Sequence, residues 1–104
     1  MKLTSNLVAV AMQLLAEPEK RHWGYDLVKS TGIRSGALYP LLGRMYDECW
    51  LDDGWEDPTE IRESRPPRRY YTVTEYGLEQ LGAIRGRAAR DPKFVRAQFR
   101  PVVL

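Results

Sequence analysis

Two short helical patterns, separated by Thr31-Gly32 within residues 24–50, place the strongest constraint on the fold of this chain. Glycine readily adopts the left-handed conformation that ends a helix, so Gly32 predicts a sharp turn between the two helices. Ile33 follows the turn, and we expect its side chain to fill the angle between the helices. The pattern therefore predicts a helix-turn-helix unit.

The inward face of the second helix is an apolar stripe at about 100° per residue, with Ser35 as the expected N-cap. Cys49 falls on this stripe, so we interpret it as a small buried hydrophobe rather than a redox sensor. Pro40 removes one hydrogen bond from a helix interior, which predicts either a later start of the regular helix or a bend. The stripe consists of Leu38, Leu41, Leu42, Met45 and Cys49.

The outward face of the same helix combines small residues with hydrogen-bond donors. Small residues would let the helix backbone approach a DNA groove closely, and the donors could bind phosphates or base edges. An ordinary solvated helix face is the alternative. The small residues are Gly36, Ala37, Pro40 and Gly43, and the donors are Arg34, Ser35, Tyr39 and Arg44.

After Trp50 the apolar period changes to two, which predicts a strand over residues 51–56. Residues 69–73 alternate again and would pair with it as an antiparallel hairpin. The intervening tip, residues 57–68, is stiffened by three prolines and carries Arg62, Arg65 and Arg68. Such a wing can follow a phosphate backbone or put an arginine into the minor groove. A solvated tip, with Glu60 and Glu63 balancing part of the charge, is the alternative.

Amphipathic helices are expected at both ends of this unit. The first follows the capping candidates Thr4 and Ser5 and ends at Pro18, and the last is capped by Thr74, with Glu75 favoured by the helix dipole. The first stripe is Leu7, Val10, Ala11, Leu14 and Leu15, and the last is Leu78, Leu81, Ile84 or Arg85, and Ala88.

Stripes at helical spacing usually form domain cores, but here the first three helices already cover one another. The last helix, with the first, is then free to pair with a second subunit. The dimerisation candidates are Leu7, Val10, Leu14, Leu78, Leu81 and Ile84.

The expected fold class is mainly α with a small β-hairpin, a winged helix-turn-helix with a C-terminal dimerisation helix. Residues 1–73 would form the DNA-binding domain and residues 74–90 the dimerisation helix packed with it. Residues 91–104 would be a basic tail, either a short helix docked on the partner or a frayed end. Six basic residues against one acidic residue follow position 84, and the preceding body is mildly acidic. Local patches, rather than net charge, must therefore bind DNA.

Several classes of function are disfavoured. With Cys49 and His22 each the single residue of its type, no disulfide, metal cluster or catalytic triad is expected, and therefore no cofactor and no enzymatic activity. The carboxylates near the first strand are explained by hairpin solubility. No apolar run approaches the ~20 residues that cross a bilayer, and no secretory signal is evident, which predicts a cytoplasmic protein without membrane contact.

Three segments together resemble the PadR-type transcriptional regulators: HWGYDLVKSTG, SGALYPLLGRMYDECWL and SRPPRRYYTVTEYG, within residues 7–81. The resemblance implies a prokaryotic or phage regulator, associated with the nucleoid, that represses as a homodimer on a palindromic operator, with the C-terminal helix crossing to the other subunit. Cys49-Trp50 replaces the usual glycine-hydrophobic end of the recognition helix. By the motif match, the groove-facing segment is Ser35, Gly36, Ala37, Tyr39 and Pro40, and the wing base is Arg68, Arg69 and Tyr70.

The leading hypothesis is a dimeric, sequence-specific repressor that binds double-stranded DNA. A small-molecule sensor with a ligand at the dimer interface is a second hypothesis, weakly supported because no aromatic residue lies between Tyr76 and Phe94. A winged protein-interaction module is a third. The first DNA contacts to test are Arg34, Tyr39 and Arg44 on the helix and Arg65, Arg68 and Arg69 on the wing.

Overall fold

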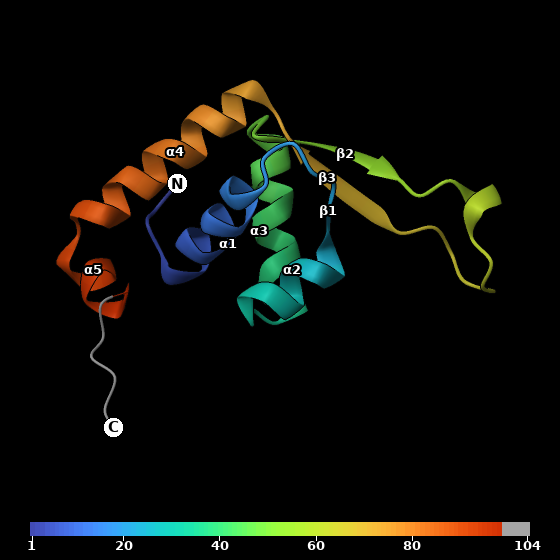
Figure 1. Cartoon of the computed structure of the whole chain (residues 1–104), viewed down its shortest axis with the longest axis horizontal. Coiled ribbons are helices and arrows are strands. Elements are labelled where there is room, and N and C mark those ends of the chain that lie inside the picture. The colour runs from blue at the N-terminus through green and yellow to red at the C-terminus, as the bar shows by residue number, and fades with distance from the viewer. Residues whose placement is uncertain (99–104) are drawn as a thin grey trace.

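The computed structural model describes residues 1–98, and it combines a helical body with a projecting hairpin (Figure 1). Three helices and a small sheet precede two C-terminal helices, so the predicted fold class, mainly α with a small β-hairpin in a winged helix-turn-helix, is confirmed. The helices are α1 (Ser5–Ala16), α2 (Gly24–Thr31), α3 (Ser35–Asp47), α4 (Glu75–Arg90) and α5 (Pro92–Gln98), with a short 3-10 turn, η1 (Pro58–Glu60). The strands are β1 (His22–Trp23), β2 (Leu51–Trp55) and β3 (Arg69–Val73).

Side-chain caps begin both flanking helices, as predicted. The Thr4 hydroxyl accepts a hydrogen bond from the Leu7 amide at 3.1 Å, and the Thr74 hydroxyl accepts one from the Gly77 amide at 2.8 Å. Each cap satisfies an amide that has no partner within the helix. The Thr74 hydroxyl also donates to the Cys49 carbonyl at 2.7 Å, which ties the start of α4 to the end of α3.

The turn between α2 and α3 has the predicted geometry. Gly32 lies in the left-handed region with φ of 72°, and its amide donates to the Val28 carbonyl at 3.0 Å. Ile33 is buried, as expected. One detail of the prediction is wrong, because the N-cap of α3 is Arg34 rather than Ser35. Of the two alternatives predicted for Pro40, a later start of the regular helix is excluded, since the helix begins at Ser35. Pro40 is exposed, so water can satisfy the carbonyl that proline leaves without an amide partner.

The interpretation of Cys49 as a buried residue is wrong. The helix ends at Asp47, and Cys49 is exposed with φ of 65°. Its amide donates to the Tyr46 carbonyl at 3.0 Å, and the Trp50 amide donates to the Met45 carbonyl at 2.8 Å. This pair of bonds is the Schellman motif, in which the left-handed position is usually glycine. Cys49 therefore occupies the position at which this motif usually has glycine.

The sheet contains the predicted hairpin and one further strand. Strands β2 and β3 pair antiparallel from Leu51↔Val73 to Trp55↔Arg69. Strand β1 pairs with the other edge of β3, giving the order β1-β3-β2. The sequence does not indicate strand β1, because a two-residue strand is too short to produce a readable alternation. The extra strand fixes the start of α2 beside the wing.

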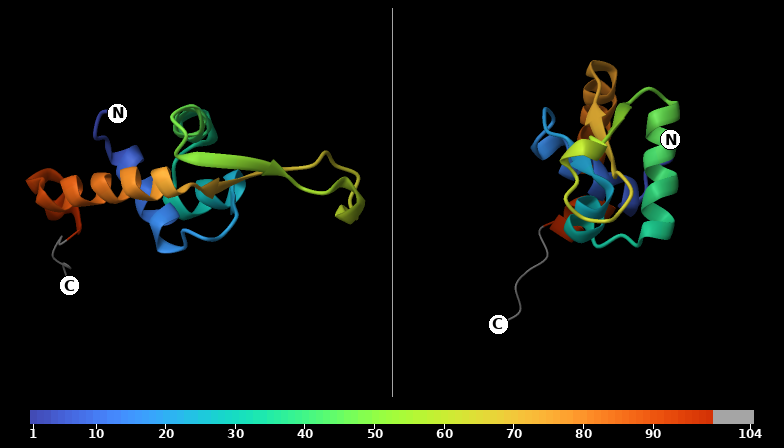
Figure 2. Two further views of the ribbon diagram at one scale, coloured as in Figure 1. Left: turned by 90° about the horizontal axis from the view of Figure 1, so that it is seen from above. Right: turned by 90° about the vertical axis from the view of Figure 1, so that its right-hand side faces the viewer.

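The core lies between α1, α3, α4 and the inner face of the sheet. The left-hand view of Figure 2 shows that α4 runs along the helical body while the wing extends far beyond it. Of the six predicted dimerisation residues, only Leu78 is exposed, with 44% of its surface accessible. The five that lie in the core of the single chain are Leu7, Val10, Leu14, Leu81 and Ile84. None of the helices within residues 1–98 has the length and apolar character needed to cross a membrane.

Candidate nucleic-acid interface

The outward face of α3 presents its predicted contact residues to solvent. Arg34 precedes the first turn, and Arg44 lies near the last turn of the helix. Neither guanidinium forms an ion pair with any residue of the described chain, 1–98. The helix N-terminus adds amide groups and a positive dipole end to this face. The exposed residues are Arg34, Ser35, Gly36, Ala37, Tyr39, Pro40 and Arg44.

Tyr39 connects α3 to the start of α2. A Cβ atom added to Gly24 would lie 2.5 Å from the Tyr39 phenol oxygen, so the ring lies directly against the Gly24 backbone. Gly24 is buried, whereas the tyrosine remains 45% exposed. Only glycine leaves space for this contact, and the contact fixes the tyrosine ring on the outward face of the recognition helix.

Arg65 is neutralised within the wing. Its Nη1 and Nη2 atoms donate to the two oxygens of Glu56 at 2.6 and 3.1 Å, and its Nε atom donates to Glu63 at 3.2 Å. These bonds hold the pKa of the Glu56 carboxyl below its usual value and raise the pKa of Arg65. A bidentate pair of this kind closes the loop of the wing, so the structure gives Arg65 a role in shaping the tip.

Arg69 is also held by neighbours rather than projected from the wing. Its Nε atom donates to Asp53 at 2.7 Å, and its guanidinium lies 4.9 Å from the ring centre of Tyr71 and 5.2 Å from that of Tyr46. Burial raises the pKa of the Tyr71 phenol, so this ring stays neutral beside the cation. Arg69 consequently joins the wing base to the C-terminal half of α3.

Arg68 differs from these two arginines because no carboxylate within residues 1–98 forms an ion pair with its side chain. The guanidinium lies 4.7 Å from the ring centre of Tyr25, at the start of α2. Tyr70 packs its ring against Gly54 of β2 and makes an edge contact with Trp23 at 5.1 Å. Arg68 is thus the predicted wing-base residue whose cation remains available to an anion.

Sequence reasoning missed three residues of this region: Arg21, Trp23 and Tyr25. The Arg21 guanidinium lies 4.5 Å from the ring centre of Tyr70, and Trp23 stacks with Tyr25 at 6.3 Å. A basic residue next to the aromatic pair in the segment RHWGY was the available signal. Without strand β1, nothing in the sequence placed this segment beside the wing.

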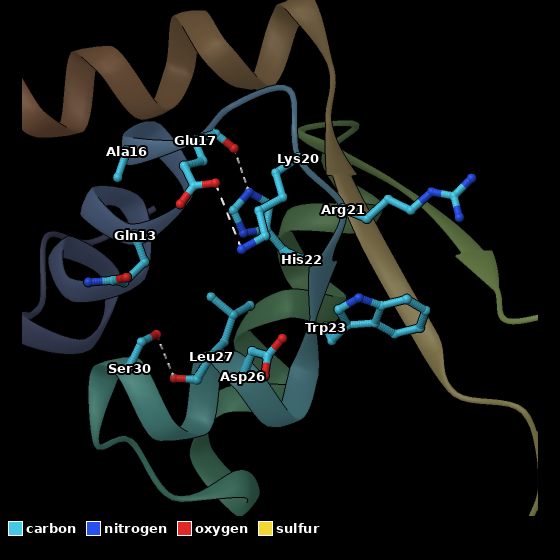
Figure 3. Close-up of a pocket in the computed structure, with 10 residues that line it drawn as sticks. All are labelled: Gln13, Ala16, Glu17, Lys20, Arg21, His22, Trp23, Asp26, Leu27 and Ser30. Carbon is cyan, nitrogen blue, oxygen red and sulfur yellow. Dashed lines mark hydrogen bonds and ion pairs between the residues drawn. The ribbon is translucent and has the colours of Figure 1, made fainter.

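A cavity of about 290 Å³ lies between the end of α1, the loop before β1, and α2 (Figure 3). Lys20 forms an ion pair with Glu17 at its edge at 3.8 Å, and the Nε2 atom of His22 donates to the Glu17 carbonyl at 2.9 Å. Gln13, Asp26 and Ser30 contribute further polar groups to its lining. No group of three potential metal ligands occurs among residues 1–98.

An exposed second helix of a helix-turn-helix, flanked by a three-stranded sheet with a projecting hairpin, defines the class of winged helix-turn-helix DNA-binding proteins. Residues 12–83 match the model of the transcriptional regulator PadR-like family. Because the match covers more than half of the chain, the protein belongs to this family and is a DNA-binding transcriptional regulator.

Solved structures agree on the fold. A PadR family regulator from Eggerthella lenta is 24% identical with a TM-score of 0.66, over 93% of this chain and 87% of that one. A PadR-like regulator from Bacillus cereus is 22% identical with a TM-score of 0.62, over 92% of each chain. The PcaV regulator of Streptomyces coelicolor, in complex with its natural ligand, is 22% identical with a TM-score of 0.65; the match covers 96% of this chain and 63% of PcaV. No curated protein matches the sequence.

Proposed function

We propose that this PadR-like regulator is a dimeric repressor that binds a palindromic operator with α3 in the major groove. The observation that carries the proposal is the outward face of α3, where Arg34 and Arg44 flank a run of small residues and have no intramolecular ion pair within residues 1–98. Arginine is the residue that most often reads guanine in the major groove. The small residues let the helix axis come close to the bases.

The wing contributes to affinity through Arg68, while Arg65 and Arg69 hold the wing in shape. Both of the latter already donate to carboxylates, and exchanging those partners for phosphate would cost the ion pairs that order the hairpin. The predicted contact set thereby separates into two groups. Arg34, Arg44 and Arg68 bind DNA, and Arg65 and Arg69 position the elements that bind it.

The dimer in this proposal uses the exposed side of α4. Leu78 and Tyr76 are large apolar residues on its first turns that remain solvent-accessible in the single chain. Residues 1–73 act as the DNA-binding domain, residues 74–90 carry the dimer contact, and α5 supports it. In a two-fold dimer, the half-sites of the operator lie about 34 Å apart or a multiple of that distance.

Fluorescence anisotropy tests the proposal with duplexes from the region upstream of the regulator's own gene and a shuffled duplex of equal length. Sequence-specific binding predicts a preference of ~10³-fold or more at physiological salt. Arg44→Ala should weaken operator binding ~10- to 100-fold and reduce the preference over the shuffled duplex. Equal, weak binding to every duplex would contradict operator-specific repression, and a footprint on a single half-site would contradict the dimer.

A second candidate function is that of an effector-responsive regulator, and the cavity between α1 and α2 favours it. Its volume of about 290 Å³ and its mixed polar lining suit a small polar molecule. Trp23 lies at the edge of the cavity, so binding should change tryptophan fluorescence saturably, and Trp23→Phe should abolish the change. A flat response to a panel of small acids and amines, with operator affinity unaltered, would dismiss this function.

A further inference from the structure

Five side chains form a continuous stack beside the base of the wing. The order is Arg21, Tyr70, Trp23, Tyr25 and Arg68, which we call the arginine–aromatic stack. The three aromatic rings meet at centre distances of 5.1 and 6.3 Å, and each terminal guanidinium lies over a ring at 4.5 or 4.7 Å. All four contacts are within the range of favourable aromatic or cation–π interactions. An arginine therefore lies at each end of a row of three aromatic rings.

The stack joins segments that are distant in the sequence. Trp23 on β1 pairs with Tyr70 on β3, and Arg68 immediately precedes β3. Tyr25 belongs to the first turn of α2, next to the glycine that the Tyr39 ring of α3 contacts. The elements that carry the stack, β1, β3 and the first turn of α2, lie close together at the base of the wing (Figure 1).

The two terminal arginines are exposed and carry the positive charge that an anion site needs. Within residues 1–98, neither Arg21 nor Arg68 forms an ion pair, in contrast to Arg65 and Arg69 of the same region. A guanidinium stacked on a ring still directs its N–H groups outward in the plane, where they match the oxygens of a phosphate. The aromatic faces also reduce the side-chain freedom that would be lost on binding.

We infer that the arginine–aromatic stack is a phosphate clamp, in which Arg21 and Arg68 bind phosphates of the DNA backbone between the recognition helix and the wing. This inference rests on the proposed function and adds a contact site to it. Arg21 binds phosphate directly, whereas Trp23, Tyr25 and Tyr70 are positioning residues that hold the two guanidinium groups. The clamp reads no base, so it contributes equally to operator and non-operator DNA.

The salt dependence of binding to a mixed-sequence duplex tests the clamp without knowledge of the operator. Each phosphate contact contributes about −0.9 to the slope of log K against log salt concentration. Arg21→Ala should therefore make the slope shallower by about 0.9. The matched control is Lys20→Ala, which removes the same charge from the adjacent position. Lys20 is paired with Glu17 at the cavity edge, while Arg21 points away from the cavity in Figure 3, so this control should keep the full slope.

A second pair of variants separates positioning from charge. Tyr70→Leu removes the ring under Arg21 without a change in charge, and it should make the slope shallower, while Tyr70→Phe keeps the ring and should retain the wild-type slope. Thermal unfolding identifies variants that keep the fold, and the Arg21 and Lys20 pair decides the question if Tyr70→Leu does not fold.

Equal slopes for wild type, Arg21→Ala and Lys20→Ala would overturn the clamp and leave the regulator proposal standing. Equal reductions in Arg21→Ala and Lys20→Ala would also overturn it, because net charge would then explain the effect. Absence of salt-dependent DNA binding by the wild-type protein would overturn the clamp and the proposed function together.

Discussion

Cys49 holds a backbone conformation that side chains rarely adopt, and it does so on the surface, where its thiol contributes little to packing. A non-glycine residue in the left-handed region reduces stability by on the order of 1–3 kcal/mol. Glycine removes this strain, but its greater conformational freedom in the unfolded chain costs about 0.5–1 kcal/mol. Cys49→Gly should therefore raise the free energy of unfolding by about 1 kcal/mol. Urea denaturation measures this, with Cys49→Ala as the control that keeps the strain. A glycine variant no more stable than the alanine variant would contradict the argument.

Glu56 gives the wing a dependence on pH. Its pKa is lowered, chiefly because Arg65 donates to it, so its folded-state pKa lies below its unfolded-state value. The stabilisation from this pair is therefore fully present above the unfolded carboxyl pKa and is lost as the pH falls through the lower, folded value. Carboxyl chemical shifts followed by NMR should show Glu56 titrating below an ordinary glutamate, and Arg65→Gln should return it toward the ordinary value. An unchanged titration in Arg65→Gln would refute this assignment.

At the scale of single elements, the regular helices and the main hairpin could be predicted because their signals are local. Thr4 and Thr74 precede apolar stripes, and alternation fixed the pairing of β2 with β3. Strand β1 could not be predicted, because its pairing with β3 depends on the tertiary fold. The ion pair of Arg65 with Glu56 could not be predicted either, because Glu56 lies nine residues earlier, across the wing loop.

Helix α3 carries a proline that its fold does not require. Pro40 lies inside the helix on the exposed face. Proline in a helix interior is about 3 kcal/mol less favourable than alanine. Proline also stiffens the unfolded chain, which offsets roughly 1 kcal/mol of this cost. Pro40→Ala should raise the free energy of unfolding by about 1 to 2 kcal/mol in urea denaturation. Pro58→Ala in the exposed turn of the wing is the control, since no helical hydrogen bond is restored there. A less stable Pro40→Ala protein would show that the helix is adapted to its proline.

At the scale of the whole molecule, the tip of the wing and α5 lie at opposite ends. Figure 1 shows the wing projecting from one side of the body, with α4 running from the wing base across the body to α5. The face of α4 that carries Leu81 and Ile84 is buried in the core of the single chain. A sequence stripe cannot distinguish a core from an interface, since both are apolar at the same spacing. The exposed residues of α4 are therefore the ones on which a dimer can depend.

Leu78 tests this dependence, because it can be changed without opening the core. With 44% of its surface accessible, Leu78→Arg should leave the thermal unfolding of the single chain nearly unchanged and shift the protein from dimer to monomer in sedimentation experiments. Operator affinity should then fall toward that of one half-site, because the second half-site no longer binds as part of the same molecule. Ala83→Arg adds the same charge at another exposed position of α4 and should remain dimeric. If Leu78→Arg stays dimeric with full operator affinity, the two subunits meet through a surface that does not include the first turns of α4.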